Sequence, residues 1–108
     1  MTLLFEQKRV KASSGTNTVS LDLQAGAVIT YVSARNLTKP WIPISIELVD
    51  PNNTSNSIVF FHRRTSIGLK GVRKQVYQKV TSLLRRLRAI FWDCDDGDDL
   101  ILKVGYEI

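Results

Sequence analysis

The sequence predicts an α+β domain: an antiparallel β-sheet of about five to six strands, which could be arranged as a sandwich, packed against one long amphipathic helix in the C-terminal half. Two observations lead to this fold class. Over the first two thirds of the chain, apolar and polar residues alternate in short segments, the period of a half-buried strand. After residue 71 the apolar residues recur every three or four positions, the period of a helix. At 108 residues the chain has the size of one domain, so we expect residues 1–108 to form a single domain.

The first two thirds are expected to hold five strands joined by short turns. In the second of them, Val19, Leu21 and Leu23 share one face. The third has apolar side chains on both faces, so we expect it to lie centrally in its sheet. The segment Asp50–Asn53, Asp-Pro-Asn-Asn, is a strong turn signal, and the polar residues after it indicate an exposed, mobile hairpin tip. The predicted strands are 3–10, 18–23, 27–34, 44–49 and 58–63.

The expected helix begins after Gly71 and ends near Gly97, and a closing strand over 99–108 follows it. It rests on one apolar stripe with helical spacing, about 20 residues long. The stripe consists of Val72, Val76, Val80, Leu83, Leu84, Leu87, Ile90 and Phe91.

Charge is distributed unevenly along the chain, whose net charge is +5. Between Pro51 and Trp92 there are nine lysines and arginines and no acidic residue, and five aspartates follow within positions 93–99. Such a distribution indicates a polyanionic partner, of which nucleic acid is the commonest and an anionic membrane surface is a weaker candidate.

The basic residues of this block define the predicted site. In a helical projection, most of them flank the apolar stripe, and two arginines of the preceding strand extend the track. A solvated helix face usually mixes both signs of charge, and this one has no acidic residue. We therefore predict a non-enzymatic nucleic-acid-binding protein that contacts the backbone with little sequence specificity and prefers single-stranded RNA or DNA to duplex. The predicted contacts are Arg63, Arg64, Lys70, Lys74, Lys79, Arg85, Arg86, Arg88 and Phe61.

Phe60 and Phe61 form an aromatic pair that runs into the two arginines. In a strand they point to opposite faces, so only one can lie under the helix, and the other could stack on a base. The alternative is that both are core residues of a two-layer sandwich.

The segment Asp93–Asp99 is open to several interpretations. Its glycine is misplaced for an EF-hand loop, so we predict no metal site. It could be a solubilising turn or a local counter-charge for Arg86 and Arg88. It could also pair with the basic face of a neighbouring copy. That last possibility gives the alternative function: a self-assembling structural or viral accessory protein, associated with a matrix or capsid, that forms a homo-oligomer.

Other functions find little support in the residues. There is one cysteine and one histidine, 32 positions apart, with no third catalytic group, so we predict no enzyme activity and no cofactor. No apolar stretch reaches the roughly 20 residues of a membrane span. The N-terminus has the wrong order of charges for a secretory signal, so we expect an intracellular protein.

Two resemblances concern architecture alone. Strands that lead through the basic connection Arg63–Leu69 into an amphipathic helix resemble Whirly-type single-strand binders, which implies single-strand binding. The chain departs from that pattern in its fifth strand and its closing strand. The alternating strands with the Asp50–Asn53 turn also resemble small viral β-sandwich proteins.

Overall fold

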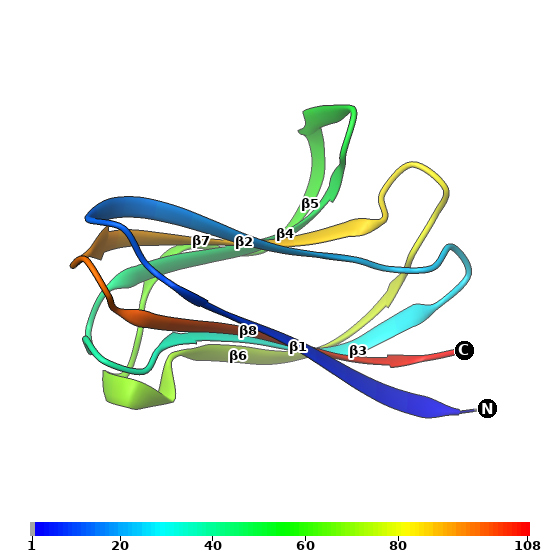
Figure 1. Ribbon diagram of the computed structural model, residues 1–108. Coiled ribbons are helices and arrows are strands. Elements are labelled where there is room, and N and C mark those ends of the chain that lie inside the picture. The colour runs from blue at the N-terminus through cyan, green and yellow to red at the C-terminus, as the bar shows by residue number, and fades with distance from the viewer. Residues whose placement is uncertain (1) are drawn as a thin grey trace.

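A computed structural model describes residues 2–108 of the chain (Figure 1). These residues form eight β-strands and one short 3₁₀ helix, η1, and they contain no α-helix. The elements are β1 (Leu3–Lys11), β2 (Gly15–Asp22), β3 (Val28–Asn36), β4 (Pro43–Asp50), β5 (Asn53–Thr65), η1 (Gly68–Lys70), β6 (Val72–Lys79), β7 (Arg86–Cys94) and β8 (Asp99–Glu107).

The strands of residues 2–108 make two four-stranded antiparallel sheets that pack face to face (Figure 1). One sheet has the order β1-β8-β3-β6 and the other the order β2-β7-β4-β5. Only β4 and β5 are both consecutive in the chain and paired in one sheet; every other connection crosses between the sheets. Two sheets of four strands with this alternating connectivity define a jelly roll.

The strands expected at the sequence level are all present, most of them longer than predicted. The strand predicted over 27–34 lies between β8 and β6, so its central position is confirmed. The Asp50–Asn53 turn joins β4 to β5, and the first residues of β5 are exposed, as expected for a hairpin tip. β5 is the longest strand of the described chain, with 13 residues.

The predicted α+β fold and its basic amphipathic helix are wrong. The region expected to be helical forms β6, a turn and β7. A spacing of four residues satisfies a strand as well as a helix, because it is twice the strand period, so Val72, Val76 and Val80 can share one face of a strand. The strand signal in this region is the alternation of Leu87, Ala89 and Phe91, all fully buried, with more exposed neighbours. The apolar residues of the predicted stripe thus come from two strands and the turn between them.

The core lies between the two sheets and is built from alternate residues of the inner strands. On β4, Ile44, Ile46 and Leu48 are fully buried, and they stand opposite the inward side chains of β7. Leu102 and Val104 of β8 face them from the other sheet. No helix is needed to cover either sheet, because each sheet covers the inner face of the other.

Candidate functional site

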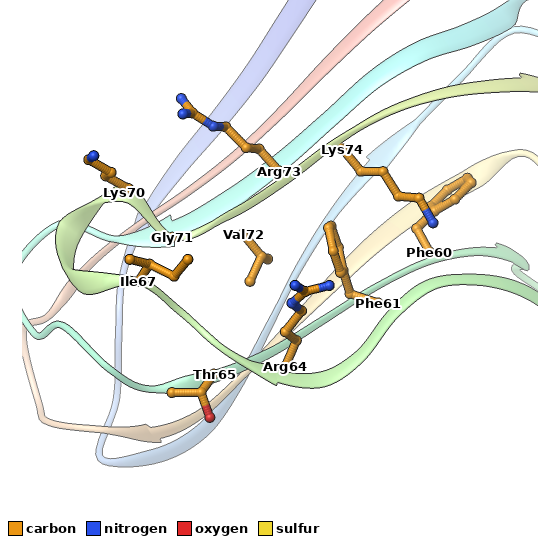
Figure 2. Close-up of a pocket in the computed structure, with 10 residues that line it drawn as sticks. All are labelled: Phe60, Phe61, Arg64, Thr65, Ile67, Lys70, Gly71, Val72, Arg73 and Lys74. Atoms are coloured by element: carbon orange, nitrogen blue, oxygen red, sulfur yellow. The ribbon is translucent and has the colours of Figure 1, made fainter.

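A basic groove lies where the edge strand of one sheet meets the edge strand of the other. It runs between β5 and β6, the segment with η1 closes one end, and it encloses about 350 Å³ (Figure 2). Four of its ten lining residues are lysine or arginine and none is acidic. The lining consists of Phe60, Phe61, Arg64, Thr65, Ile67, Lys70, Gly71, Val72, Arg73 and Lys74.

A β-bulge in β5 directs Arg64 into the groove. Ile44 pairs with Arg64 and Ile46 with Phe61, so β5 has one more residue than β4 between these two pairs. Arg63 in the bulge has a φ of 45°, and its backbone N–H donates to Ser45 Oγ at 2.7 Å. An extra residue shifts the alternation of side chains by one position. Arg64 therefore comes to the same side as Phe61, although the strand period would place them on opposite faces.

Gly71 allows the chain after η1 to lie close against the neighbouring strand β3. Its φ is 68° and its ψ −150°, a combination open essentially to glycine alone. A Cβ at this position would overlap Ala34 O and the side chain of Arg35, and would lie 2.8 Å from Arg35 Cα. The absence of a side chain at Gly71 thus lets the chain turn tightly from η1 into β6, which brings Lys70 and Arg73 to the end of the groove.

Two aromatic side chains line the groove, and Phe61 is the more buried of them, with only 8% exposed. Arg64 Cζ lies 5.6 Å and Lys74 Nζ 5.9 Å from the centroid of its ring, within range of a cation–π interaction (Figure 2). Phe60 also lines the groove, is half-buried and packs against the core. Phe61 therefore forms part of the core and positions two cations, and Phe60 is the more accessible of the two rings.

The positive charge continues beyond the groove onto the outer face of the β1-β8-β3-β6 sheet. A second hollow shares Lys70 and Arg73 with the groove and adds Arg35 and Lys103. Within residues 2–108, none of these four cations forms an ion pair, nor do Arg64 and Lys74. The sequence prediction missed Arg35 and Lys103 as site residues, because their proximity depends on strand order. It also missed Arg73, because a helical projection places that residue close to the apolar stripe.

Of the nine predicted contact residues, the groove brings together Arg64, Lys70, Lys74 and Phe61. The others lie elsewhere. Arg63 stacks over the ring of Trp92, with Cζ 4.6 Å from the ring centroid. Lys79 is at the far end of β6, and Arg85 lies in the connection to β7.

Arg86 and Arg88 are both engaged by carboxylates of the same chain. Arg86 Nε donates to Asp22 Oδ1 at 2.7 Å, and Arg88 Nε donates to Glu47 Oε1 at 2.8 Å. The hydrogen bonds and charge of Arg86 hold the pKa of Asp22 below its ordinary value. The idea that the aspartate-rich segment is their local counter-charge is therefore wrong, since strand β2 and strand β4 supply it.

The turn Asp93–Asp99 is partly structural. Buried Asp98 accepts hydrogen bonds from Asn36 Nδ2 and from the backbone N–H of Asp95, each at 2.9 Å. Asp99 accepts from Arg9 Nε at 2.9 Å, and this guanidinium lowers the pKa of the Asp99 carboxyl. The remaining carboxylates, those of Asp93, Asp95 and Asp96, are exposed, and the Asp95 carboxylate lies 3.5 Å from Lys39 Nζ.

Two further kinds of feature are absent from the described part of the chain, a metal-binding cluster and a membrane-spanning helix. No three residues among His, Cys, Asp and Glu come close enough to hold one metal ion within residues 2–108. The same residues include no helix with the length and apolar character needed to cross a bilayer.

Comparison with known proteins identifies the fold and no family. No family model and no curated protein matches the sequence. The major capsid protein P2 of bacteriophage PM2 superposes with a TM-score of 0.64 at 8% identity, over 96% of this chain and 44% of that one. A chain of the cyanophage Pam1 capsid asymmetric unit gives a TM-score of 0.55 at 10% identity, over 97% of this chain and 82% of that one.

A third similar structure comes from Sulfolobus turreted icosahedral virus, with a TM-score of 0.58 at 14% identity, over 98% of this chain and 29% of that one. The chain thus spans less than half of the PM2 protein and less than a third of the Sulfolobus virus chain. The structural neighbours include viral capsid proteins with jelly-roll folds, and at these identities the likeness concerns the fold.

Proposed function

We propose that this protein is a structural subunit of a viral particle that assembles with further copies of itself. The observation that carries the proposal is the superposition of nearly the whole chain on chains from three viral structures, at TM-scores from 0.55 to 0.64. This supports the assembly alternative of the sequence analysis over its main prediction. The nucleic-acid prediction draws no support from these comparisons.

Exposed apolar side chains on one sheet face support a role in assembly. On the outer face of the β1-β8-β3-β6 sheet, Phe5 is 68% and Tyr77 79% exposed, and Leu3 is exposed as well. Phe5 lies over Gly105 of the neighbouring strand, next to Tyr31, so Phe5 and Tyr31 share one surface. Soluble monomers rarely expose contiguous apolar patches of more than a few hundred Å², and larger ones mark interaction sites. A neighbouring subunit that covered this face would remove it from water.

The exposed carboxylates of the Asp93–Asp99 turn could supply a second, electrostatic contact between copies. β7 begins at Arg86 and ends at Cys94, so the Asp93–Asp99 turn and the connection that contains Arg85 lie at opposite ends of the molecule (Figure 1). Lys79 is exposed at the same end as Arg85, and neither forms an ion pair within the described chain. Copies placed end to end would bring these cations to Asp93 and Asp96 of the next copy, a heterologous contact that repeats along an array.

Sedimentation velocity of the nuclease-treated protein, over a range of protein and salt concentrations, tests the assembly. We expect oligomers that grow with protein concentration, and replacement of Phe5 and Tyr77 by serine should shift their formation to higher protein concentration, because only the electrostatic contact remains. Val59→Ser is the control, since Val59 is also exposed but lies on β5 of the other sheet. A protein that stays monomeric at every concentration and salt would refute the proposed function.

The electrostatic contact has its own test. Asp93→Asn together with Asp96→Asn removes two charges, and asparagine tolerates the positive φ of 59° at position 93. We expect the double variant to assemble only at higher protein concentration, and its assembly to depend less on salt. Unchanged assembly would contradict the charge contact and leave the apolar contact standing.

A further inference from the structure

We propose that the basic groove between β5 and β6 binds single-stranded nucleic acid through its phosphates. This goes beyond assembly and does not depend on it, because the groove itself lies at the sheet edges, whereas the proposed subunit contacts use a sheet face and the two ends. Only the extension of the charge over Arg35 and Lys103 reaches that sheet face. The predicted basic helix is absent from the described chain, so it cannot be the binding surface. The groove is formed instead by residues of β5, η1 and β6.

The first argument is the distribution of charge in the folded chain. Within residues 2–108, five of the fifteen lysines and arginines form ion pairs, namely Arg9, Lys11, Lys39, Arg86 and Arg88. No cation that lines the groove or the adjoining hollow is among them, and no carboxylate lines either hollow. Six cations that form no ion pair in the described chain gather on one part of the surface, which makes it a site for a polyanion.

The second argument is the shape of the charged surface. Arg64 comes from β5, Lys70 from η1 and Lys74 from β6, and Arg35 and Lys103 carry the charge onto the adjoining sheet face. In Figure 2, Arg64 and Lys74 lie beside the Phe61 ring, whereas Lys70 and Arg73 extend from the opposite end of the groove. Cations spread along a path match a ligand with repeating phosphates better than a single small anion.

The third argument concerns the accessible ring. Phe60 lines the groove and is half-buried, so part of its side chain meets solvent, and it lies beside Lys74 at one end of the groove (Figure 2). An unpaired base can stack on such a ring while its phosphates meet the cations, and a duplex does not offer its bases in this way. This favours a single strand.

Edge strands also need charged side chains for another reason, because charge on an edge prevents pairing with the edge of another sheet. Carboxylates can meet that need as well, although lysine is the commonest choice. Edge protection alone does not explain why the lining of the groove contains four cations and no carboxylate.

The test is the fluorescence anisotropy of a labelled single-stranded oligonucleotide, oligo(dT) or oligo(U), titrated with protein at several salt concentrations. Four phosphate contacts predict a slope of log affinity against log salt of about −3 on a single strand. Lys70→Ala with Lys74→Ala removes two contacts and should weaken the slope by about 1.4. The matched control is Lys8→Ala with Lys11→Ala: two exposed lysines of β1, outside the groove and outside the charge contact between copies, whose loss changes the net charge equally. It should leave the slope unchanged.

Circular dichroism and thermal unfolding of both double variants establish that each is folded. Three results would overturn the proposal: no binding at low salt, equal weakening by the groove variant and by the control, or unchanged oligonucleotide affinity in the groove variant. If that variant instead loses self-association in the absence of nucleic acid, the groove belongs to a subunit contact. Assembly itself is measured without nucleic acid, so the two proposals can fail separately.

Discussion

Replacement of Gly71 by alanine should destabilise the fold much more than the same change at Gly26. Both glycines have a positive φ, 68° and 94° respectively, so both variants force an L-residue into an unfavourable backbone region. The space around them differs. A Cβ at Gly26 would meet nothing within 4 Å, whereas one at Gly71 would overlap Ala34 O and Arg35 Cβ, which belong to the adjacent strand.

The magnitude follows from these two terms. Backbone strain of this kind costs about 1–3 kcal/mol, and both variants incur it. Overlap with close-packed neighbours adds about 1–3 kcal/mol, and only Gly71→Ala incurs it, because the colliding atoms are backbone or directly attached to it. We therefore expect Gly71→Ala to lose about 2–6 kcal/mol in the free energy of unfolding, against about 1–3 kcal/mol for Gly26→Ala. A domain of this size has about 5–15 kcal/mol in total, so the first variant approaches the limit of folding.

Urea unfolding followed by tryptophan fluorescence measures the difference. Trp92 is half-buried beneath the Arg63 guanidinium, so its emission should change on unfolding. Equal losses in the two variants would refute the reasoning, because they would show that β3 and β6 do not approach as closely as described. If Gly71→Ala is too unstable to purify while Gly26→Ala folds, the predicted order holds.

Three other predictions concern the core and the titratable groups. Phe91→Ala removes a fully buried side chain and should cost about 3–5 kcal/mol in chemical denaturation; a loss below 1 kcal/mol would contradict its place in the core. Because Arg9 lowers the folded-state pKa of Asp99, the interaction stabilises the fold above the unfolded pKa of about 3.9 and is lost as pH falls through the folded value. Asp99→Asn should therefore reduce the dependence of stability on pH in the acid range, and an unchanged acid transition would count against this pairing. The Cys94 thiol is buried, and that burial raises its pKa, so it should react with a thiol reagent only after denaturation; rapid labelling of the native protein would disprove this.

The clearest strand signal in the sequence is a segment with one buried face and one polar or half-exposed face. Residues 18–23 show it clearly, with Val19 and Leu23 buried and Asp22 exposed. In β6 the alternation is weak. Its residues from Arg73 to Gln75 are all exposed, because an edge strand at an open side of the sandwich has little to bury. In that region the helical spacing of the apolar residues is therefore a stronger signal than strand alternation.

The groove could be predicted only in part for a related reason. Arg64, Lys70 and Lys74 lie within eleven positions of one another, so the acid-free block pointed to them. Arg35 and Lys103 join them only because β3 lies between β8 and β6. Arg64 faces the groove only because β5 has a bulge, and nothing in a run of alternating residues marks where the extra residue falls.

The sheet edges connect the two proposals. β5 and β6 end their sheets on the same side of the sandwich, where free backbone groups would invite pairing with another copy. Four cations, the bulge at Arg63 and the turn at η1 make this side unsuitable for strand addition. Like charges would also repel two such edges. Subunits that assemble through the outer sheet face and the molecular ends would therefore leave the groove open, so that a strand of nucleic acid could reach it in the assembled particle as well as in the free protein.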